Sequence, residues 1–276
     1  MSAAETVVHP LALVENGAQL GAGVRIGPFC HIGSDVTLDD GVELVSHVSV
    51  IGRTTIGAGT RVFPHVALGA APQDLKYKGE PTSLTIGANC LLRENFTAHV
   101  GTPTGRGHTQ IGDNCFLMAG SHVGHDCVIG NNVIMANNSV IGGHCQLADN
   151  VIVSGLVALH QFIRIGRGAM LAGSSGVAGD VIPYGLIQGS RSTLQGLNII
   201  GLRRSGASHS EIAELRRAYK MLFDRATPFA ENIVRVRDAY GQNARVAEVL
   251  DFVDSREKRS LVFPAMTSGR LEAEGV

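Results

Sequence analysis

The sequence predicts a mainly β protein, a left-handed parallel β-helix of hexapeptide repeats followed by a small α-helical domain. Three observations predict this class. An aliphatic residue recurs at every sixth position, glycine often follows it, and helical spacing replaces the repeat near the C-terminus. The predicted boundaries are residues 1–190 for the β-helix and 191–276 for the helical domain.

The six-residue series is the strongest of these signals. It is aliphatic at every step from Val8 to Leu68, continues from Ile86 to Ala98, and runs in a new register from Ile111 to Val177. An α-helix would space its apolar residues by three and four, and an ordinary strand by two. Three hexapeptides close one coil of about 18 residues, with the aliphatic side chains inside. The periodicity does not determine the hand, and the left-handed form is expected because this repeat usually takes it.

Composition limits both the core and the possible partners. With 35 glycines, no tryptophan and 5% aromatic residues, the core must be filled by small aliphatic side chains. A formal charge of −1 gives no global electrostatic argument for binding nucleic acid or an anionic membrane. Neither a secretory signal nor an apolar run of about 18 residues is visible, so a soluble, cytoplasmic protein is expected.

The five cysteines fit the same repeat. Each lies four residues after a core aliphatic, in a small inward position that Val, Thr, Ser and Ala fill elsewhere: Cys30, Cys90, Cys115, Cys127 and Cys145. They are therefore predicted to be small core residues, and neither disulfides nor metal ligands.

Two insertions and three helix starts interrupt or follow the repeat. The insertions, residues 70–83 and 101–108, are predicted to be loops, which in solenoids often carry function. Ser208 and Glu211 form a capping box before an amphipathic stretch. Pro228 and Asn243 are candidate starts of two further helices that would cap the open end of the β-helix.

Stacking by 18 residues gathers polar side chains at one corner. Asp126 should lie about 5 Å from His144, and His125 should stack on Gly143 and then on Gln161, with His160 in the next column. Three interpretations are open: ordinary surface histidines, a zinc site, or a general base oriented by a carboxylate beside exposed glycine amides. The third is favoured, because a base near neutrality and an amide for an oxyanion are what acyl transfer requires.

The chain resembles the bacterial UDP-N-acetylglucosamine O-acyltransferases over nearly its whole length. The motifs that carry the resemblance are "HP" at 9–10, "IGPF" at 26–29, "QDLKYKGEPT" at 73–82, "HVGHDC" at 122–127, "ALHQF" at 158–162, "SSGVAGDVIPY" at 174–184 and "GLNIIGLRR" at 196–204. The resemblance implies transfer of a 3-hydroxyacyl chain from acyl carrier protein to the sugar 3-hydroxyl, in the first step of lipid A biosynthesis. It also implies a homotrimer with active sites between subunits, no cofactor beyond the carrier-bound thioester, and no metal.

Roles for individual residues follow from the same resemblance. His125 would be the general base, Asp126 would orient it, and the Gly143 amide would stabilise the oxyanion. Residues expected to bind sugar, nucleotide or carrier arm are Gln73, Asp74, Lys76, His122, His144, His160, Gln161, Asn198 and Arg204, and Gly173 matches the position that limits acyl length.

Three positions depart from the family pattern. Ile200 replaces an acidic residue, Ser205 a second base, and Arg191 a common histidine, so nucleotide contacts are less defined than the chemistry at His125. Acylation of a 3-amino UDP-sugar is the first alternative. The related N-acyltransferases are disfavoured because they carry an extra N-terminal domain, whereas the coils here begin by Val8. A histidine-ligated metalloenzyme and a purely structural solenoid are the alternatives from other classes.

Overall fold

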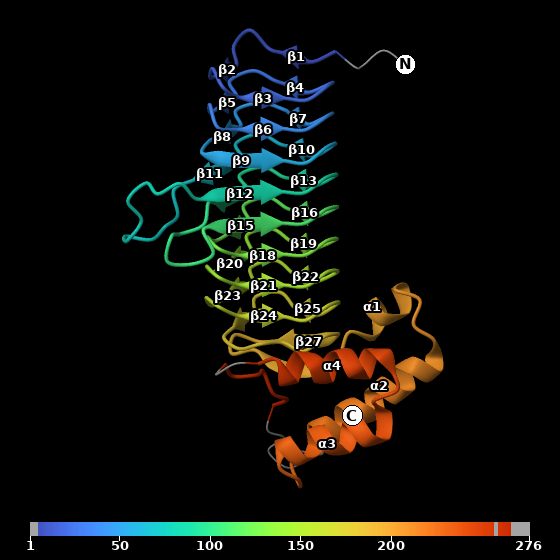
Figure 1. Cartoon of the computed structure of the whole chain (residues 1–276). Coiled ribbons are helices and arrows are strands. Elements are labelled where there is room, and N and C mark those ends of the chain that lie inside the picture. Colours follow the sequence, from blue (N-terminus) through green and yellow to red (C-terminus); the bar gives the residue numbers. More distant parts are fainter. Residues whose placement is uncertain (1–4, 257–258, 266–276) are drawn as a thin grey trace, which may run out of the picture.

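A long β-helix with three flat faces forms most of the molecule, and four helices cover its C-terminal end (Figure 1). The computed structural model describes residues 5–256 and 259–265. The ends of the two predicted domains, residues 1–4 and 266–276, lie outside the described residues. The helix is left-handed, as expected.

Each face is a parallel sheet whose neighbouring strands come from successive coils. Through the regular coils the partner residues are 18 apart, as in the pairing of His122 with Val140. Sheet A contains β1 (Val7–Val8), β4 (Arg25–Ile26), β7 (Glu43–Leu44), β10 (Arg61–Val62), β13 (Leu91–Leu92), β16 (Phe116–Leu117), β19 (Ile134–Met135), β22 (Ile152–Val153), β25 (Met170–Leu171), β27 (Gly185–Gln188) and β28 (Thr193–Leu197).

The other two faces complete the prism. Sheet B contains β2 (Leu13–Val14), β5 (His31–Ile32), β8 (Ser49–Val50), β11 (Ala67–Ala70), β14 (Thr97–His99), β17 (His122–Val123), β20 (Val140–Ile141), β23 (Ala158–Leu159) and β26 (Gly176–Val177). Sheet C contains β3 (Gln19–Leu20), β6 (Thr37–Leu38), β9 (Arg53–Ile56), β12 (Ser83–Ile86), β15 (His108–Ile111), β18 (Val128–Ile129), β21 (Gln146–Leu147) and β24 (Arg164–Ile165).

The six-residue series forms the core, with one exception at the N-terminal end. From Ile26 to Val177 every member of the series is at most 5% exposed. Val8 is 41% exposed, so its prediction as a core residue was wrong, whereas Val14 and Leu20 are half-buried and pack against the core. These three belong to the first coil, and no other coil of the described residues covers them on that side.

The small inward positions also behave as predicted, except at one site. All five cysteines are free and buried. Phe96, which occupies the same kind of position, is fully buried, so one large aromatic does enter the core. The small Ala98 two residues later stands where other coils carry a larger aliphatic, which offsets the volume of the ring.

Both insertions leave the β-helix at the corner between sheets B and C, and they project side by side (Figure 1). One joins β11 to β12 and the other joins β14 to β15. This corner is therefore the most elaborated surface of the β-helix.

The C-terminal unit begins later than predicted, because β28 still belongs to sheet A and pairs antiparallel with β27. The predicted boundary at 190/191 falls in the turn between these strands. The helices are α1 (Ile199–Arg204), α2 (His209–Leu222), α3 (Phe229–Tyr240) and α4 (Ala244–Asp254). Ser208 and Glu211 form the predicted capping box of α2, and Asn243 caps α4 through its side chain. Pro228 directly precedes α3 without a side-chain capping bond.

The helical unit is attached to the last coils by apolar contacts and by the polar contacts of Arg164. Leu215, Val246 and Val249 pack with Ile182 and Leu197 of the β-helix. The Arg164 guanidinium forms an ion pair with the buried Asp180, and it donates to the Phe252 and Ser255 carbonyls at the end of α4. Within residues 5–256 and 259–265, no helix combines the length and the apolar character needed to cross a membrane.

Candidate active site

The polar corner predicted from the 18-residue step is formed by the turns that join sheet B to sheet C. Asp126, His144 and Phe162 occupy equivalent positions in three successive coils, with φ of 61°, 62° and 68°. This left-handed conformation is uncommon outside glycine and is favoured here by the tight repeated turn. The His144 and Phe162 rings stack face to face, with centroids 4.2 Å apart and planes 2° from parallel.

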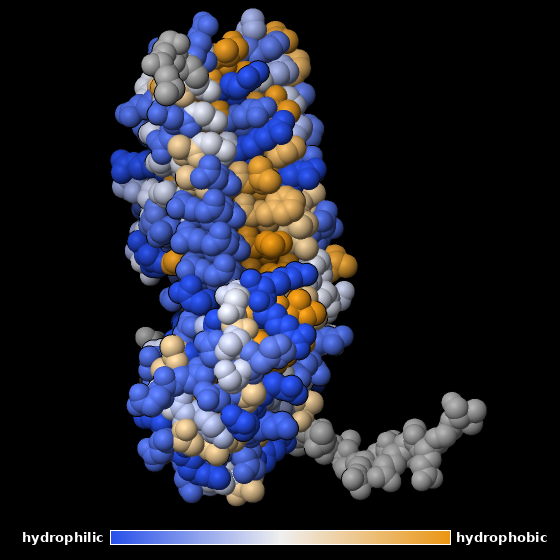
Figure 2. All heavy atoms as spheres, turned by 90° about the vertical axis from the view of Figure 1, so that its right-hand side faces the viewer, coloured by the Kyte–Doolittle hydropathy of each residue, from blue (hydrophilic) through white to orange (hydrophobic). Residues whose placement is uncertain are grey.

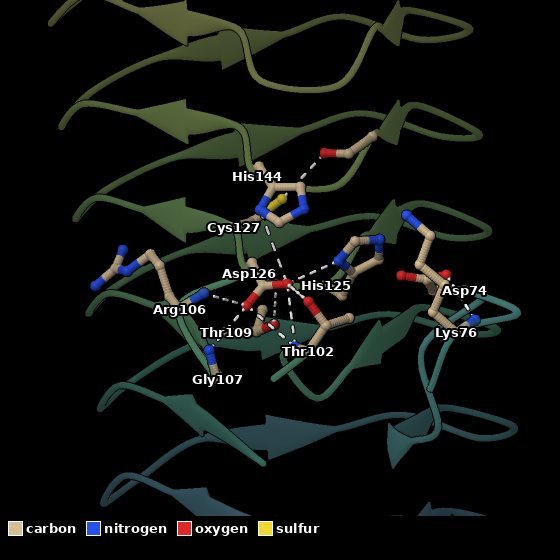
Figure 3. A network of polar contacts seen from close by, with 11 residues as sticks. Asp74, Lys76, Thr102, Arg106, Gly107, Thr109, His125, Asp126, Cys127 and His144 are labelled. Atoms are coloured by element: carbon tan, nitrogen blue, oxygen red, sulfur yellow. Dashed lines mark hydrogen bonds and ion pairs between the residues drawn. The ribbon is translucent and has the colours of Figure 1, made fainter. Parts of the chain in front are cut away.

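His125 and Asp126 form a hydrogen-bonded pair at the centre of this corner (Figure 3). Nδ1 of His125 lies 2.8 Å from Oδ2 of Asp126, and the Asp126 side chain is fully buried. Because a carboxylate only accepts hydrogen bonds, Nδ1 carries the hydrogen and Nε2 keeps its lone pair. His144 approaches the same oxygen from the next coil, with Nδ1 at 3.8 Å.

The surroundings keep Asp126 ionised and His144 neutral. Burial alone would raise the pKa of Asp126, but hydrogen bonds from Thr102 and His125 outweigh burial and hold that pKa below its usual value. Burial lowers the pKa of His144, and the neighbouring carboxylate of Asp126 opposes this shift only in part. The site thus combines a fixed negative charge with an uncharged imidazole.

Gly143 lies directly beneath the His125 ring. A methyl group at Gly143 would be 2.7 Å from Nε2 of His125, so only glycine leaves room for the ring. The amides of Gly142 and His144 donate to carbonyl oxygens of adjacent coils. The Gly143 amide has no such partner within the described part of the chain, and it is therefore available to a ligand beside His125.

An open cleft of about 830 Å³ lies over the pair. Of the residues predicted to bind substrate, Gln73, Asp74, Lys76, His144 and Gln161 line it together with His125. Gln73, Asp74 and Lys76 come from the first loop, and Thr104, Gly105 and Arg106 come from the second. Such a volume suits a ligand larger than a monosaccharide.

Two predicted histidines lie beside the cleft and not in its lining. His122 is on the outer face of sheet B, where Nδ1 is 2.8 Å from Thr97 Oγ1 and the ring meets His99 edge to face. Burial, followed by the charges of His99 and His125, lowers the pKa of His122 to about 4. His160 is exposed and lines a different cavity, next to Arg191, so it does not converge on His125 as predicted.

The remaining predicted residues lie elsewhere on the single chain. Gly173 is exposed at the corner between sheets A and B, close to Gly155. Asn198 caps α1 through Gly201 N–H and donates to the Gly168 carbonyl, so it has a structural role. Arg204 is exposed in the last turn of α1.

The structure also reveals residues that the periodicity did not identify. Thr102 and Thr109 both contact Asp126, and His99 packs on His122. One more 18-residue step from Asp126 and His144 would have reached Phe162. The loop residue Thr102 and His99, which pairs with Ala70 just after the register shift in β11, lie outside the repeat, and no spacing rule predicts their contacts.

The geometry favours a proton-transfer pair over a metal site. Potential ligand atoms of His125, Asp126 and His144 lie within 4.8 Å of one another. However, Asp126 Oδ1 already accepts hydrogen bonds from two loop amides, and His125 Nδ1 points at Oδ2. The Asp126 carboxylate and Nδ1 of His125 are thus hydrogen-bonded to each other, and the carboxylate is also hydrogen-bonded to the loop.

Comparison with known proteins identifies the family of the chain. The family model described as UDP N-acetylglucosamine O-acyltransferase, domain 2, matches residues 180–262, and the bacterial transferase hexapeptide model matches residues 108–143. An acyl-[acyl-carrier-protein]–UDP-N-acetylglucosamine O-acyltransferase of Mesorhizobium japonicum is 52% identical, over 96% of this chain and 95% of that protein. The chain belongs to this family.

Other members of the acyltransferase family give the same result. The protein of the same name from Bartonella henselae is 46% identical over 97% of both chains. The solved structure of the Francisella novicida UDP-N-acetylglucosamine acyltransferase has a TM-score of 0.90 at 31% identity, covering 97% of this chain and all of that one. The Campylobacter jejuni enzyme gives a TM-score of 0.87 at 36% identity, with 94% and 99% covered.

Proposed function

We propose that this chain transfers a 3-hydroxyacyl group from acyl carrier protein to the 3-hydroxyl of UDP-N-acetylglucosamine, in the cytoplasm, as the first step of lipid A biosynthesis. The names of its relatives supply the donor and acceptor. The observation that carries the chemistry is the His125–Asp126 pair, which leaves Nε2 as the base beside the unpartnered Gly143 amide.

The reaction balances with these groups alone. Nε2 of His125 removes the proton of the sugar hydroxyl as its oxygen attacks the thioester carbonyl carbon. The tetrahedral oxyanion accepts a hydrogen bond from the Gly143 amide. The intermediate then expels the pantetheine thiolate, which takes the proton back from the His125 imidazolium. Because the thioester is already activated, no cofactor or metal is needed.

Binding roles are assigned to the loops and to neighbouring coils. Asp74 and Lys76 in the first loop, with Gln73 and Gln161, would hold the sugar and the carrier arm in the cleft. His122, His144 and His160 would position the substrates, and Gly173 would leave the acyl groove long because it has no side chain.

We further propose that the functional unit is a homotrimer with sites between subunits. The outer face of sheet A supports this, because in its middle coils the outward residues form an apolar band: Leu91, Phe116, Ile134, Ile152 and Met170. Figure 2 shows this band beside a polar corner. A band of this kind is typical of an interface. In a trimer, the exposed Arg204 would serve the cleft of a neighbouring subunit, and Asn198 would fix the start of the helix that carries it.

The decisive experiment is a transfer assay. Carrier proteins loaded with 3-hydroxyacyl chains of several lengths are offered with UDP-N-acetylglucosamine and with its 3-amino analogue. Transfer to the hydroxyl sugar supports the proposal, transfer to the amino sugar alone would replace it with N-acylation, and no transfer to either would refute it. His125→Ala should lower kcat by at least about 10²-fold, and a near-normal rate would assign the base to another residue.

A further inference from the structure

The second loop closes directly over the carboxylate of Asp126. Oδ1 accepts hydrogen bonds from the amides of Arg106 at 2.8 Å and Gly107 at 3.1 Å, and the Thr102 amide lies 3.1 Å from both oxygens. Oδ2 accepts from the Thr102 hydroxyl at 2.7 Å and from His125 Nδ1 at 2.8 Å. Figure 3 shows these contacts converging on the one side chain.

This arrangement is specific to the loop and is tightly packed. Thr102 is 1% exposed, whereas its loop neighbours Thr104 and Gly105 are exposed. A methyl group at Gly105 would lie 2.5 Å from Cγ of Asp126, so the loop main chain rests against the carboxylate. Thr109 lies in the strand that follows the loop, and its hydroxyl oxygen accepts a hydrogen bond from the Asp126 amide at 2.8 Å. The loop thus fixes the side chain of Asp126, and the strand after the loop fixes its main chain.

Only main-chain and hydroxyl donors come from the loop, while charged groups approach from other sides. Arg106 donates its amide, and its side chain is exposed. His125 and His144 face Asp126 from its own coil and the next one, and Asp74 faces His144 from the first loop. The loop therefore orients the carboxylate through fixed dipoles and adds no competing charge.

We propose that Thr102 is a positioning residue for the reaction, and that the loop at 101–108 holds Asp126 in the one orientation that directs His125 Nε2 into the cleft. This inference rests on the proposed function. During acyl transfer the His125 ring gains and then loses a proton, and Asp126 must accept the Nδ1 hydrogen throughout. An acceptor fixed by four loop donors does this without reorganising.

The first test compares two substitutions at Thr102 with a matched core threonine. Thr102→Val removes the hydroxyl donor and should lower kcat by about 10- to 100-fold with little change in KM, because one hydrogen bond to a charged group is lost. It should also move the acid limb of the pH profile to higher pH, since Asp126 becomes easier to protonate. Thr102→Ser keeps the donor and should restore kcat and the profile.

Thr60→Val is the control, because Thr60 is also fully buried and hydrogen-bonded, to the Gly87 carbonyl, but lies at another corner of the prism. It should lose stability without changing kcat or the pH profile. If Thr102→Val matches Thr60→Val in all three measurements, Thr102 is merely structural and the inference is overturned.

A second test does not depend on turnover. Nitrogen-15 NMR of His125 should show a single tautomer protonated at Nδ1 in the wild type. Thr102→Val and Gly105→Ala should both show a tautomer mixture, the second because its methyl group would push against the Asp126 carboxylate. An unchanged tautomer in both variants would overturn the inference, even if the transfer assay succeeds. If the tautomer changes in the variants but the wild type shows no transfer activity, only the proposed reaction is refuted and the positioning role of Thr102 stands.

Discussion

The space beneath the His125 ring depends on a single missing side chain. A Cβ at Gly143 would lie 2.7 Å from Nε2 of His125, so the missing side chain lets the proposed base and the proposed oxyanion donor lie next to each other. Steric fit at this point therefore controls the chemistry more than it controls the fold.

Gly143→Ala should separate these two effects. The new methyl would displace the His125 ring, which is a movable side chain, so kcat should fall by about 10²-fold while the free energy of unfolding changes by less than about 1 kcal/mol. Steady-state kinetics and urea unfolding measure the two quantities. A large loss of stability with unchanged kcat would contradict this account.

His122 gives the protein a pH-dependent stability. Its pKa of about 4 in the folded chain lies below the usual value near 6.5, so between these values the unfolded chain binds the extra proton. Stability should therefore fall as the pH decreases from about 7 to 4. Because the ring is partly exposed, the contribution is reduced by solvent screening to about 1–2 kcal/mol.

His122→Gln should remove that part of the decline. Urea unfolding at several pH values, for wild type and variant, measures the difference, and proton NMR of the His122 ring measures its titration directly. A ring that titrates near 6.5 in the folded protein would disprove this explanation.

At the scale of the strands, each coil contributes one inward aliphatic per face, and outward residues contribute little to the core. Ile111 on β15 is 1% exposed, and its neighbour Gln110 points outward from the same strand. Ile111→Ala should lower the free energy of unfolding by about 2–5 kcal/mol, and Gln110→Ala by less than about 0.5 kcal/mol. Chemical unfolding of both variants tests this, and equal effects would contradict the assignment of inner and outer faces.

At the scale of the whole molecule, the apolar band on sheet A predicts its assembly. Ile134→Asp places a charge in the band without entering the core, and it should dissociate the proposed trimer into folded single chains. Light scattering gives the mass, and Gln146→Asp on the exposed face of sheet C is the matched control. A wild-type protein that is already monomeric would refute the trimer.

The fold was predictable because the repeat encodes it many times over. Every coil repeats the same inward aliphatic, so a chance match at one position cannot alter the pattern. The incomplete burial of Val8, Val14 and Leu20 has a common cause. Burial of a residue in a solenoid depends on the coil above it, and sequence spacing carries no information about an open end.

The site was predictable to the same extent as the repeat. The 18-residue step alone predicts that His125, Asp126, Gly143 and His144 lie together, as they do in the structure. The contacts of Thr102 with Asp126 were not predictable, because the conformation of an inserted loop has no period. The step also did not show that His160 lines a different cavity, next to Arg191, because the step places only the main chain of a residue.

The coil pairing described above also has a kinetic consequence. Strand partners are separated by only 18 residues in the regular coils, and by 25 or 30 where a loop intervenes, as between Leu91 and its partners Phe116 and Arg61. Contact order is therefore low for a β protein of this size, which favours rapid propagation from any nucleus. The loop-bearing coils carry the largest closure entropy. The coils that carry the two loops beside His125 and Asp126 should therefore close more slowly during folding than the regular coils.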